Sequence, residues 1–395
     1  MKKKTKLLIR DAFLSTILSC VLLAILSIAL FNIRFFNVFH KAFEDFSFLD
    51  VFYSEKFVED AKINDAIILV NIENLDREGI AILLEAVLDE QPKVVGFDII
   101  LENRSHRTQV DSILADLLKN DKVVTVFNYN EDGTIVENDL FFATARASTY
   151  ANFDFDFKES QVIREFIGIK DLYGATQYAF ATKLAKAYLS DELWNAYNYD
   201  KKLSELQYIN YSGNIEKYTQ LNLLDFSPGV PKPILKDKIV IMGFLGSSTS
   251  NNAFNIEDKL WTPLNKYFAG KSDRDMYGTV VHANIVNMLI KNDLLLKVSN
   301  FWLGVITFIG MFFSTMLYIK LNRKFKVSYR TRKQTYQLFV SIGVLIIVYG
   351  LLKNGIVLRP FIVIAGILLA GSYFKYYKHL VRYIKTKRKW KTYIK

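Results

Sequence analysis

Seven polar residues of this sequence follow or begin short apolar segments, where they could contact a ligand. They are Glu73, Asp98, Glu102, Asn128, Ser247, His282 and Asn284. If the apolar segments are parallel strands, their carboxyl ends share one edge of a sheet, and open sheets bind ligands at that edge. Carboxylates gathered there could hold a cation or an amine-bearing small molecule. The alternative is that Asp98 caps the following helix or pairs with a buried basic residue.

The same residues show no pattern typical of catalysis or of metal binding. Ser247, His282 and Asp258 could be drawn as a hydrolase triad, but no nucleophile elbow surrounds the serine. Residues 244–250 could cradle an anion with backbone amides, although they lack a Walker A lysine and suit a plain turn. No histidine stands at ligand spacing with the acids, and the single cysteine rules out a cysteine-based zinc site. We expect a protein that is not an enzyme and has no catalytic residue, no metal and no cofactor.

His282 and Asn284 begin a helical segment, which leaves a second role open to them. Free backbone groups at a helix start are often satisfied by nearby polar side chains. An imidazole and an amide at this position could therefore stabilise the fold and take no part in ligand binding.

The elements that must position these residues alternate between strand and helix. Residues 66–72, 93–100 and 122–127 are short apolar runs of the buried-strand type. Residues 75–90 and 110–118 lie between them and have apolar side chains at helical spacing. A strand–helix–strand–helix–strand succession implies a parallel sheet with right-handed crossovers.

The middle of the chain changes character. Residues 152–157 alternate phenylalanine with polar side chains, which predicts an antiparallel hairpin with residues 161–169. Residues 176–189 read as a helix, 238–243 as a further buried strand, and 280–290 as a closing helix. The predicted fold is an α/β domain with a mainly parallel sheet and an antiparallel insertion.

Four apolar segments flank this domain and are long enough to cross a membrane: 12–33, 301–319, 334–352 and 357–374. The first has 22 residues, about 33 Å as a helix. We interpret it as a retained anchor, the alternative being a cleaved signal peptide. The expected membrane part is therefore all-α, with four transmembrane helices.

The charges divide along the same boundaries. Residues 34–300 contain 28 Lys and Arg against 39 Asp and Glu, whereas the remainder contains 23 and one. By the positive-inside rule, the basic segments 1–11, 320–333 and 375–395 are cytoplasmic, and the domain 34–300 is extracytoplasmic. The basic excess thus indicates membrane flanks and no nucleic-acid partner. The tail 375–395 could bind anionic lipid head groups or serve only to set the topology.

Several segments, in this order, resemble the second type of CHASE domain, a sensory extracellular domain associated with bacterial cyclases and histidine kinases. The matching segments are 67–73, 93–98, 151–154 with 162–164, 209–213, 235–243, 261–263 and 277–284. The resemblance covers residues 40–298 and extends to one helix before the domain and three after it. It implies a multi-pass protein of the bacterial cytoplasmic membrane. Three features depart from the family pattern: Glu73-Asn74 replaces an aspartate–glutamate pair, the loop after Asn103 is short, and residues 375–395 are too short for an effector domain.

Three function classes follow from these observations. The first is a membrane-anchored sensory or binding protein that passes a signal or assembly cue to a separate partner. The second is a non-enzymatic structural subunit of a larger cell-envelope complex, and the third is an external hydrolase. We favour the first. Its expected partners are membrane lipids, a small-molecule or cation ligand, and another membrane or cytoplasmic protein.

Overall fold

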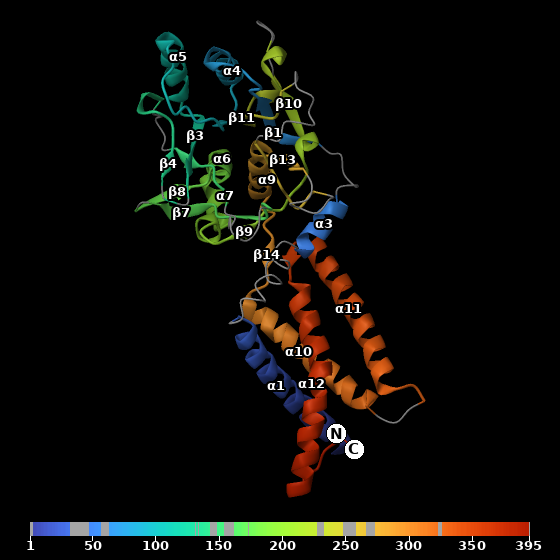
Figure 1. Cartoon of the computed structure of the whole chain (residues 1–395). Coiled ribbons are helices and arrows are strands. Elements are labelled where there is room, and N and C mark those ends of the chain that lie inside the picture. Colours follow the sequence, from blue (N-terminus) through green and yellow to red (C-terminus); the bar gives the residue numbers. More distant parts are fainter. Residues whose placement is uncertain are drawn as a thin grey trace. The chain divides into compact units, whose positions relative to one another are not determined.

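The computed structural model divides the chain into two compact units (Figure 1). One unit comprises Glu44–Leu295, and the other comprises Met1–Phe43 with Leu296–Lys395. The structure describes residues 3–31, 47–56, 63–130, 132, 134–142, 148–153, 162–172, 174–226, 233–247, 258–265, 273–322 and 326–394. Each unit is described by itself below.

The unit Glu44–Leu295 is built on a seven-stranded sheet with the order β10-β1-β11-β2-β3-β4, in which β5 also pairs with β3. The strands are β1 (Asn64–Asn71), β2 (Val94–Phe97), β3 (Val123–Tyr129), β4 (Ile135–Val136), β5 (Thr149–Tyr150), β10 (Tyr218–Leu221) and β11 (Ile239–Gly243). All pairs are parallel except β3 with β4. The central strand β11 is buried along its whole length. The prediction of a mainly parallel sheet is therefore confirmed.

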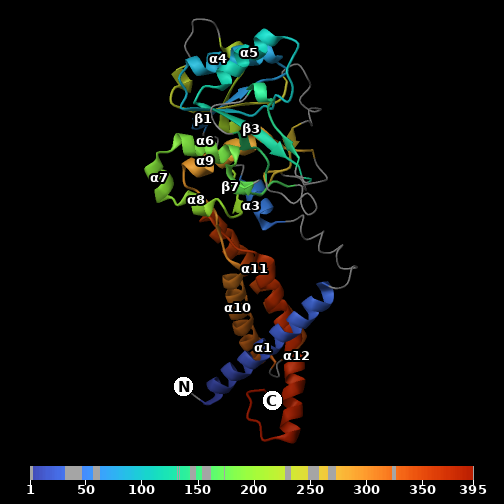
Figure 2. The same cartoon turned by 90° about the vertical axis from the view of Figure 1, so that its left-hand side faces the viewer.

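Helices cover both faces of this sheet, as Figure 2 shows. Helices α4 (Arg77–Asp89) and α5 (Thr108–Leu118) lie on one face, and α6 (Phe180–Tyr188) and α9 (Gly278–Ile290) lie on the other. A strand buried on both faces must be apolar throughout. This requirement explains why the strand segments read as continuous apolar runs in the sequence.

Gly96 in β2 lets α6 approach the sheet closely. A Cβ atom at this position would lie 2.6 Å from Cζ of Phe180 and 2.8 Å from Cδ1 of Leu184. Both distances are shorter than side chains tolerate, so the contact between β2 and α6 requires glycine.

Short antiparallel pairs complete the domain. They are β6 (Glu165–Phe166) with β9 (Gln207–Tyr208), β7 (Ile169–Leu172) with β8 (Ala175–Tyr178), and β12 (Lys259–Leu260) with β13 (Met276–Tyr277). Three short helices accompany them: α3 (Phe48–Lys56), α7 (Asp191–Ala196) and α8 (Tyr199–Lys202). Turns of 3₁₀ helix span η2 (Leu140–Phe142), η3 (Ile215–Lys217), η4 (Leu223–Asp225) and η5 (Pro233–Leu235).

One local prediction lies partly outside the described residues, and another needs correction. Residues 154–161 of the expected hairpin lie outside the described residues, and the described part of its second strand pairs with β8 and β9. The helix expected over 176–189 begins only at Phe180, because residues 175–178 pair with β7. At residues 175–178 the pairing with β7 therefore overrides the local helical pattern.

The other unit contains four helices that are long and apolar enough to cross a membrane. They are α1 (Lys3–Phe31), α10 (Asn300–Leu321), α11 (Tyr329–Lys353) and α12 (Pro360–Lys387). Helices α1, α10 and α12 contact one another, and α11 contacts α12. Gly366 of α12 permits a close approach, since a Cβ there would lie 2.6 Å from Cγ2 of Thr307 in α10.

The last helix begins later and extends further than the sequence predicts. Residues Ile356–Val357 form β15, which pairs in parallel with β14 (Leu296–Lys297), and Pro360 occupies the first turn of α12. Proline suits that position and disfavours helical backbone at the residue before it. The helix then continues through Lys387, so most of the predicted basic tail is helical.

Candidate ligand-binding edge of the sheet

Asp98 lies directly after β2 at the carboxyl edge of the sheet. Its backbone N–H donates to the carbonyl of Met242 at 2.9 Å, and its carboxylate accepts a hydrogen bond of 2.8 Å from Oγ1 of Thr279. Thr279 is in the first turn of α9. Burial of the carboxyl group raises the pKa of Asp98 to about 6, although the bond from Thr279 lowers it in part. This edge thus holds a carboxyl group whose pKa lies close to neutral pH.

Two neighbouring segments reach the same edge. Gly243 ends β11, and a Cβ there would lie 3.3 Å from Cβ of Asp98 and would also meet Oγ1 of Thr279. Asn71 ends β1; its side chain donates to the carbonyl of Gly246 at 2.8 Å and accepts from N–H of Leu245 at 2.9 Å. The loop after β11 is therefore fastened to the end of β1, and Gly243, the last residue of β11, lies next to Asp98.

The other candidate residues on strand ends lie further from Asp98. Glu73 is half-buried with φ +46°, in the turn after β1. Strand β11 separates β1 from β2, so the ends of these strands are about 10 Å apart. Glu102 is exposed in the loop after β2, and Asn128 in β3 is half-buried opposite Val136 of β4. Among the described residues, the hydrogen bonds of Asp98 are with Met242 and Thr279 and do not involve Glu73, Glu102 or Asn128.

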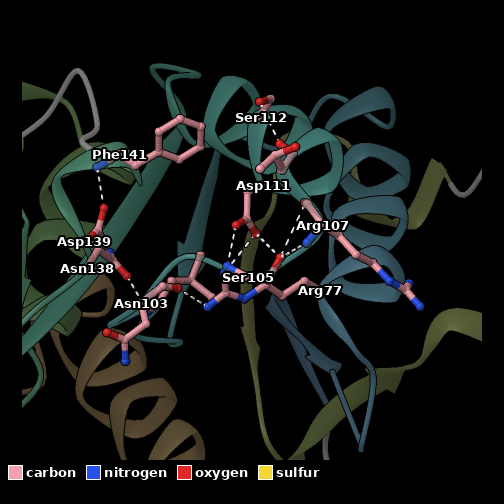
Figure 3. A network of polar contacts seen from close by, with 11 residues as sticks. Arg77, Asn103, Ser105, Arg107, Asp111, Ser112, Asn138, Asp139 and Phe141 are labelled. Atoms are coloured by element: carbon pink, nitrogen blue, oxygen red, sulfur yellow. Dashed lines mark hydrogen bonds and ion pairs between the residues drawn. The ribbon is translucent and has the colours of Figure 1, made fainter.

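The loop between Asp98 and α5 is held by a buried ion pair (Figure 3). Arg77 donates to Asp111 at 2.8 Å, and the side chain of Asp111 is 0% exposed. Asp111 also accepts from N–H of Ser105 at 2.6 Å and from its hydroxyl at 3.0 Å, and Arg77 donates to the carbonyl of Asn103. Burial alone would raise the pKa of Asp111, but these donors outweigh it and lower the pKa. The loop that follows Asp98 is therefore anchored on the face of α4 and α5.

His282 is buried one turn further along α9. Its ring lies 4.5 Å from the ring of Phe153 and 5.0 Å from that of Phe180. Burial lowers the pKa of His282 to about 3, so the imidazole is neutral at physiological pH. Its Nδ1 has no hydrogen-bond partner among the described residues, and Asp258 is exposed. A triad in which Asp258 orients His282 through Nδ1 is therefore not formed. Ser247, the third member, is buried.

Asn284 has a structural role in the described domain. Its Oδ1 accepts from N–H of Ser212 at 2.8 Å, from the Ser212 hydroxyl at 2.9 Å and from N–H of Gly213 at 3.3 Å. Its Nδ2 donates to the carbonyls of Gly213 at 2.8 Å and Val280 at 2.9 Å. These bonds occupy the donors and acceptors of a fully buried amide. Asn284 therefore ties α9 to the loop 212–213 and is removed from the ligand-binding candidates.

A cluster that the sequence analysis missed connects the two ends of the domain. The hydroxyl of Tyr53 in α3 donates to Oδ1 of Asn210 at 2.9 Å, and Nδ2 of Asn210 donates to the carbonyl of Asp293 at 3.2 Å. Nearby, Arg164 forms a two-pronged ion pair with Asp50 of α3, at 2.9 and 2.8 Å. The segment 209–213 was noted only as part of the family pattern, and nothing in its composition indicates these contacts.

The described residues do not contain a group of three or more His, Cys, Asp or Glu side chains suited to hold a metal ion. The architecture is that of an α/β domain joined to helices apolar enough to span a membrane. The CHASE2 domain model matches residues 21–317, and the chain therefore belongs to the CHASE2 family, a family of sensory extracellular domains. No curated protein and no solved structure matches the chain.

Proposed function

We propose that this protein is an extracytoplasmic sensor of the bacterial cytoplasmic membrane that binds a cation or an amine-bearing small molecule at Asp98. The observation that carries the proposal is the desolvated carboxyl of Asp98, whose described side-chain partner is the neutral hydroxyl of Thr279. A carboxylate with a strongly perturbed pKa at the carboxyl edge of a parallel sheet is typical of a functional site. Membership of a sensory family supports the same conclusion.

The charge distribution supports the orientation. The unit formed by residues 1–43 and 296–395 contains 26 Lys and Arg and one acidic residue, Asp11. Its basic residues concentrate before the first apolar segment, between the second and third, and after the fourth, which favours a cytoplasmic position for these regions. The domain 44–295 is then outside the cell membrane, with both termini inside.

Helix α9 is the element through which ligand binding would reach the ends of the domain. Its first turn holds Asp98 through Thr279, and one turn and a half later Asn284 holds the loop 212–213. That loop continues into Asn210, which contacts both Tyr53 of α3 and the carbonyl of Asp293. A ligand that binds two arrangements of α9 with unequal affinity would shift both attachments of the domain. The signal would pass from there to a separate partner protein.

The binding proposal is tested by ligand-induced stabilisation of the full-length protein in detergent. Mono- and divalent metal cations, polyamines and amino acids serve as probes, and the melting temperature of the domain is the measurement. A ligand at 100-fold excess over its Kd stabilises by about 2.7 kcal/mol. We expect Asp98→Asn to lose this response. Asp116→Asn should keep it, because Asp116 is an exposed carboxylate of α5, which covers the face of the sheet opposite to α9. Equal responses of the two variants would refute a site at Asp98. A partner that co-purifies equally with wild type and Asp98→Asn, with no probe binding, would favour the structural-subunit alternative.

The orientation is tested by cysteine labelling, for which the chain is well suited because Cys20 is its only cysteine. In a Cys20→Ser background, Lys201→Cys places a thiol on an exposed site of the domain, and Lys387→Cys places one near the end of α12. A membrane-impermeant maleimide should label the first in spheroplasts and the second only after the membrane is permeabilised. The reverse pattern would overturn the orientation.

A further inference from the structure

A hollow with a basic lining lies in the helical unit. It has a volume of about 310 Å³ and is formed by the end of α10, the first turns of α11 and the part of α12 that follows Gly371. Its cationic lining comes from Lys333 of α11 and from Lys375, Lys378 and Arg382 of α12. No aspartate or glutamate is among the lining residues.

Within this unit, acidic side chains are too few to neutralise these cations. Residues 296–395 contain no aspartate or glutamate, and residues 1–43 contain Asp11 alone. Asp11 is already engaged: it accepts hydrogen bonds from Arg10, Tyr377, Thr392 and N–H of Tyr393. Lys378 donates to Oδ1 of the neutral Asn322 at 3.2 Å. A cluster of like charges brought together in this way is stabilised by a bound anion.

One residue of the lining carries an unused hydrogen-bond donor. Tyr329 lines the hollow, and its hydroxyl is buried and has no hydrogen-bond partner among the described residues. A buried hydroxyl without a partner costs about 1–3 kcal/mol. An anion in the hollow would accept its hydrogen bond and remove that cost.

The level of the hollow indicates where the anion comes from. Lys333 directly precedes the uncharged run 334–352, and Lys375 directly follows the run 360–374. The hollow therefore lies where apolar segments of α11 and α12 end, which is the depth of lipid head groups. Further along α11, the side chains of Leu338 and Phe339 are 60% and 68% exposed and could contact the acyl chains of a lipid.

We propose that this hollow binds the phosphate of one anionic phospholipid, held by Lys333, Lys378 and Arg382 and by a hydrogen bond from Tyr329. The lipid fills the space between α10, α11 and α12 at the basic end of the helices. It thereby links the first turns of α11 to the basic end of α12. This site is independent of the ligand proposed for Asp98.

The test uses the full-length protein in detergent, titrated with short-chain phosphatidylglycerol and followed by the thermal stability of the helical unit. Zwitterionic phosphatidylcholine, inorganic phosphate and an oligoglutamate peptide are the comparison ligands. We expect saturable binding of phosphatidylglycerol and much weaker effects of the other three. Loss of two cations in Lys333→Gln/Lys378→Gln should raise the apparent Kd by about 25-fold, at about fivefold for each charge.

The matched control is Lys387→Gln/Lys389→Gln, which removes the same charge from exposed positions outside the hollow. It should leave the apparent Kd within about twofold, as expected for separate sites. A second variant, Tyr329→Phe, should leave the lipid-free protein as stable or more stable, yet weaken lipid binding by about tenfold.

Four results would overturn the proposal. An equal loss in the control pair would mean a diffuse attraction to the whole basic end. Equally tight binding of inorganic phosphate would assign the hollow to a soluble anion, and preference for oligoglutamate would assign it to an acidic protein segment. Tyr329→Phe with unchanged lipid affinity would contradict the hydrogen bond from Tyr329 that the proposed site requires.

Discussion

Replacement of Asp98 by asparagine should stabilise the domain while it abolishes ligand response. In the folded domain the pKa of Asp98 is raised from 3.8 to about 6 by burial. At about 1.4 kcal/mol for each pH unit, ionisation of this carboxyl in the folded state costs about 3 kcal/mol. Asp98 keeps partial solvent exposure, and the ionised group is screened to that extent, so we expect a measured cost of about 2 kcal/mol.

The sign of the pH dependence follows from the direction of the shift. Between the unfolded pKa near 4 and the folded pKa near 6, the folded state binds more protons than the unfolded state. The stability of the wild-type domain therefore falls as the pH rises through this window. Asp98→Asn removes the titration, so it should gain about 2 kcal/mol over the wild type above pH ~6 and nothing below pH ~4.

Thr279→Val provides the matched control for this prediction. It deletes the one described side-chain donor to Asp98 and keeps the carboxyl group. Because that bond favours the ionised form, its loss should raise the pKa of Asp98 further and lower the stability at neutral pH. The two variants at one contact should therefore change the stability in opposite directions.

The assay is chemical denaturation of the full-length protein in detergent across pH, followed by tryptophan fluorescence. Trp194 and Trp261 report on the domain once Trp302 and Trp390 of the helical unit are replaced by phenylalanine. Trp194 is buried, so its emission responds to unfolding. Parallel stability curves for wild type and Asp98→Asn between pH ~4 and ~6 would refute the desolvation argument.

Three further predictions concern the packing that surrounds this site. Asp111→Asn should destabilise the domain by about 2 kcal/mol, because Arg77 loses a buried ionised partner. Since the pKa of Asp111 is lowered, this difference should be present above pH ~4 and disappear as the pH falls through the folded pKa, which denaturation at several pH values would show. Asn284→Ala should cost about 3 kcal/mol or more and speed hydrogen exchange of the amides of residues 212–213, because their buried groups lose their partner; slow exchange there would contradict the assigned role. Gly96→Ala should cost about 1–3 kcal/mol through its clash with Phe180, and a melting temperature equal to that of the wild type would show that α6 can move away.

Elements defined by local patterns could be predicted from the sequence. Four long apolar segments, the buried strand segments and the helices of the α/β domain all appear in the structure close to their expected positions. Predictions that depended on strand pairing were less successful. The helix expected over residues 176–189 begins only at Phe180, because residues 175–178 form β8 and pair with β7. The hairpin expected from residues 152–157 and 161–169 lies partly outside the described residues, and the described part of its second strand pairs with β8 and β9.

The candidate site divides in the same way. Asp98 could be singled out because an acidic residue after a buried strand is visible in the sequence. The hydrogen-bond partner of Asp98 could not be predicted in this way, since Thr279 lies 181 residues further along the chain. Glu73 was expected beside Asp98, but β11 pairs between β1 and β2 and separates them. The binding role of Asn284 was excluded only by the hydrogen bonds that fill its amide.

By itself the sequence determined which segments are apolar enough to enter a membrane or a sheet, and where charge collects between them. These properties belong to residues near one another in the chain, so composition and periodicity express them directly. Only the tertiary structure decided that β11 lies at the centre of the sheet, that Thr279 faces Asp98, and that Asn210 joins Tyr53 to Asp293. Such contacts arise when distant segments bury their surfaces together, and no local pattern specifies which polar groups will then share a buried site.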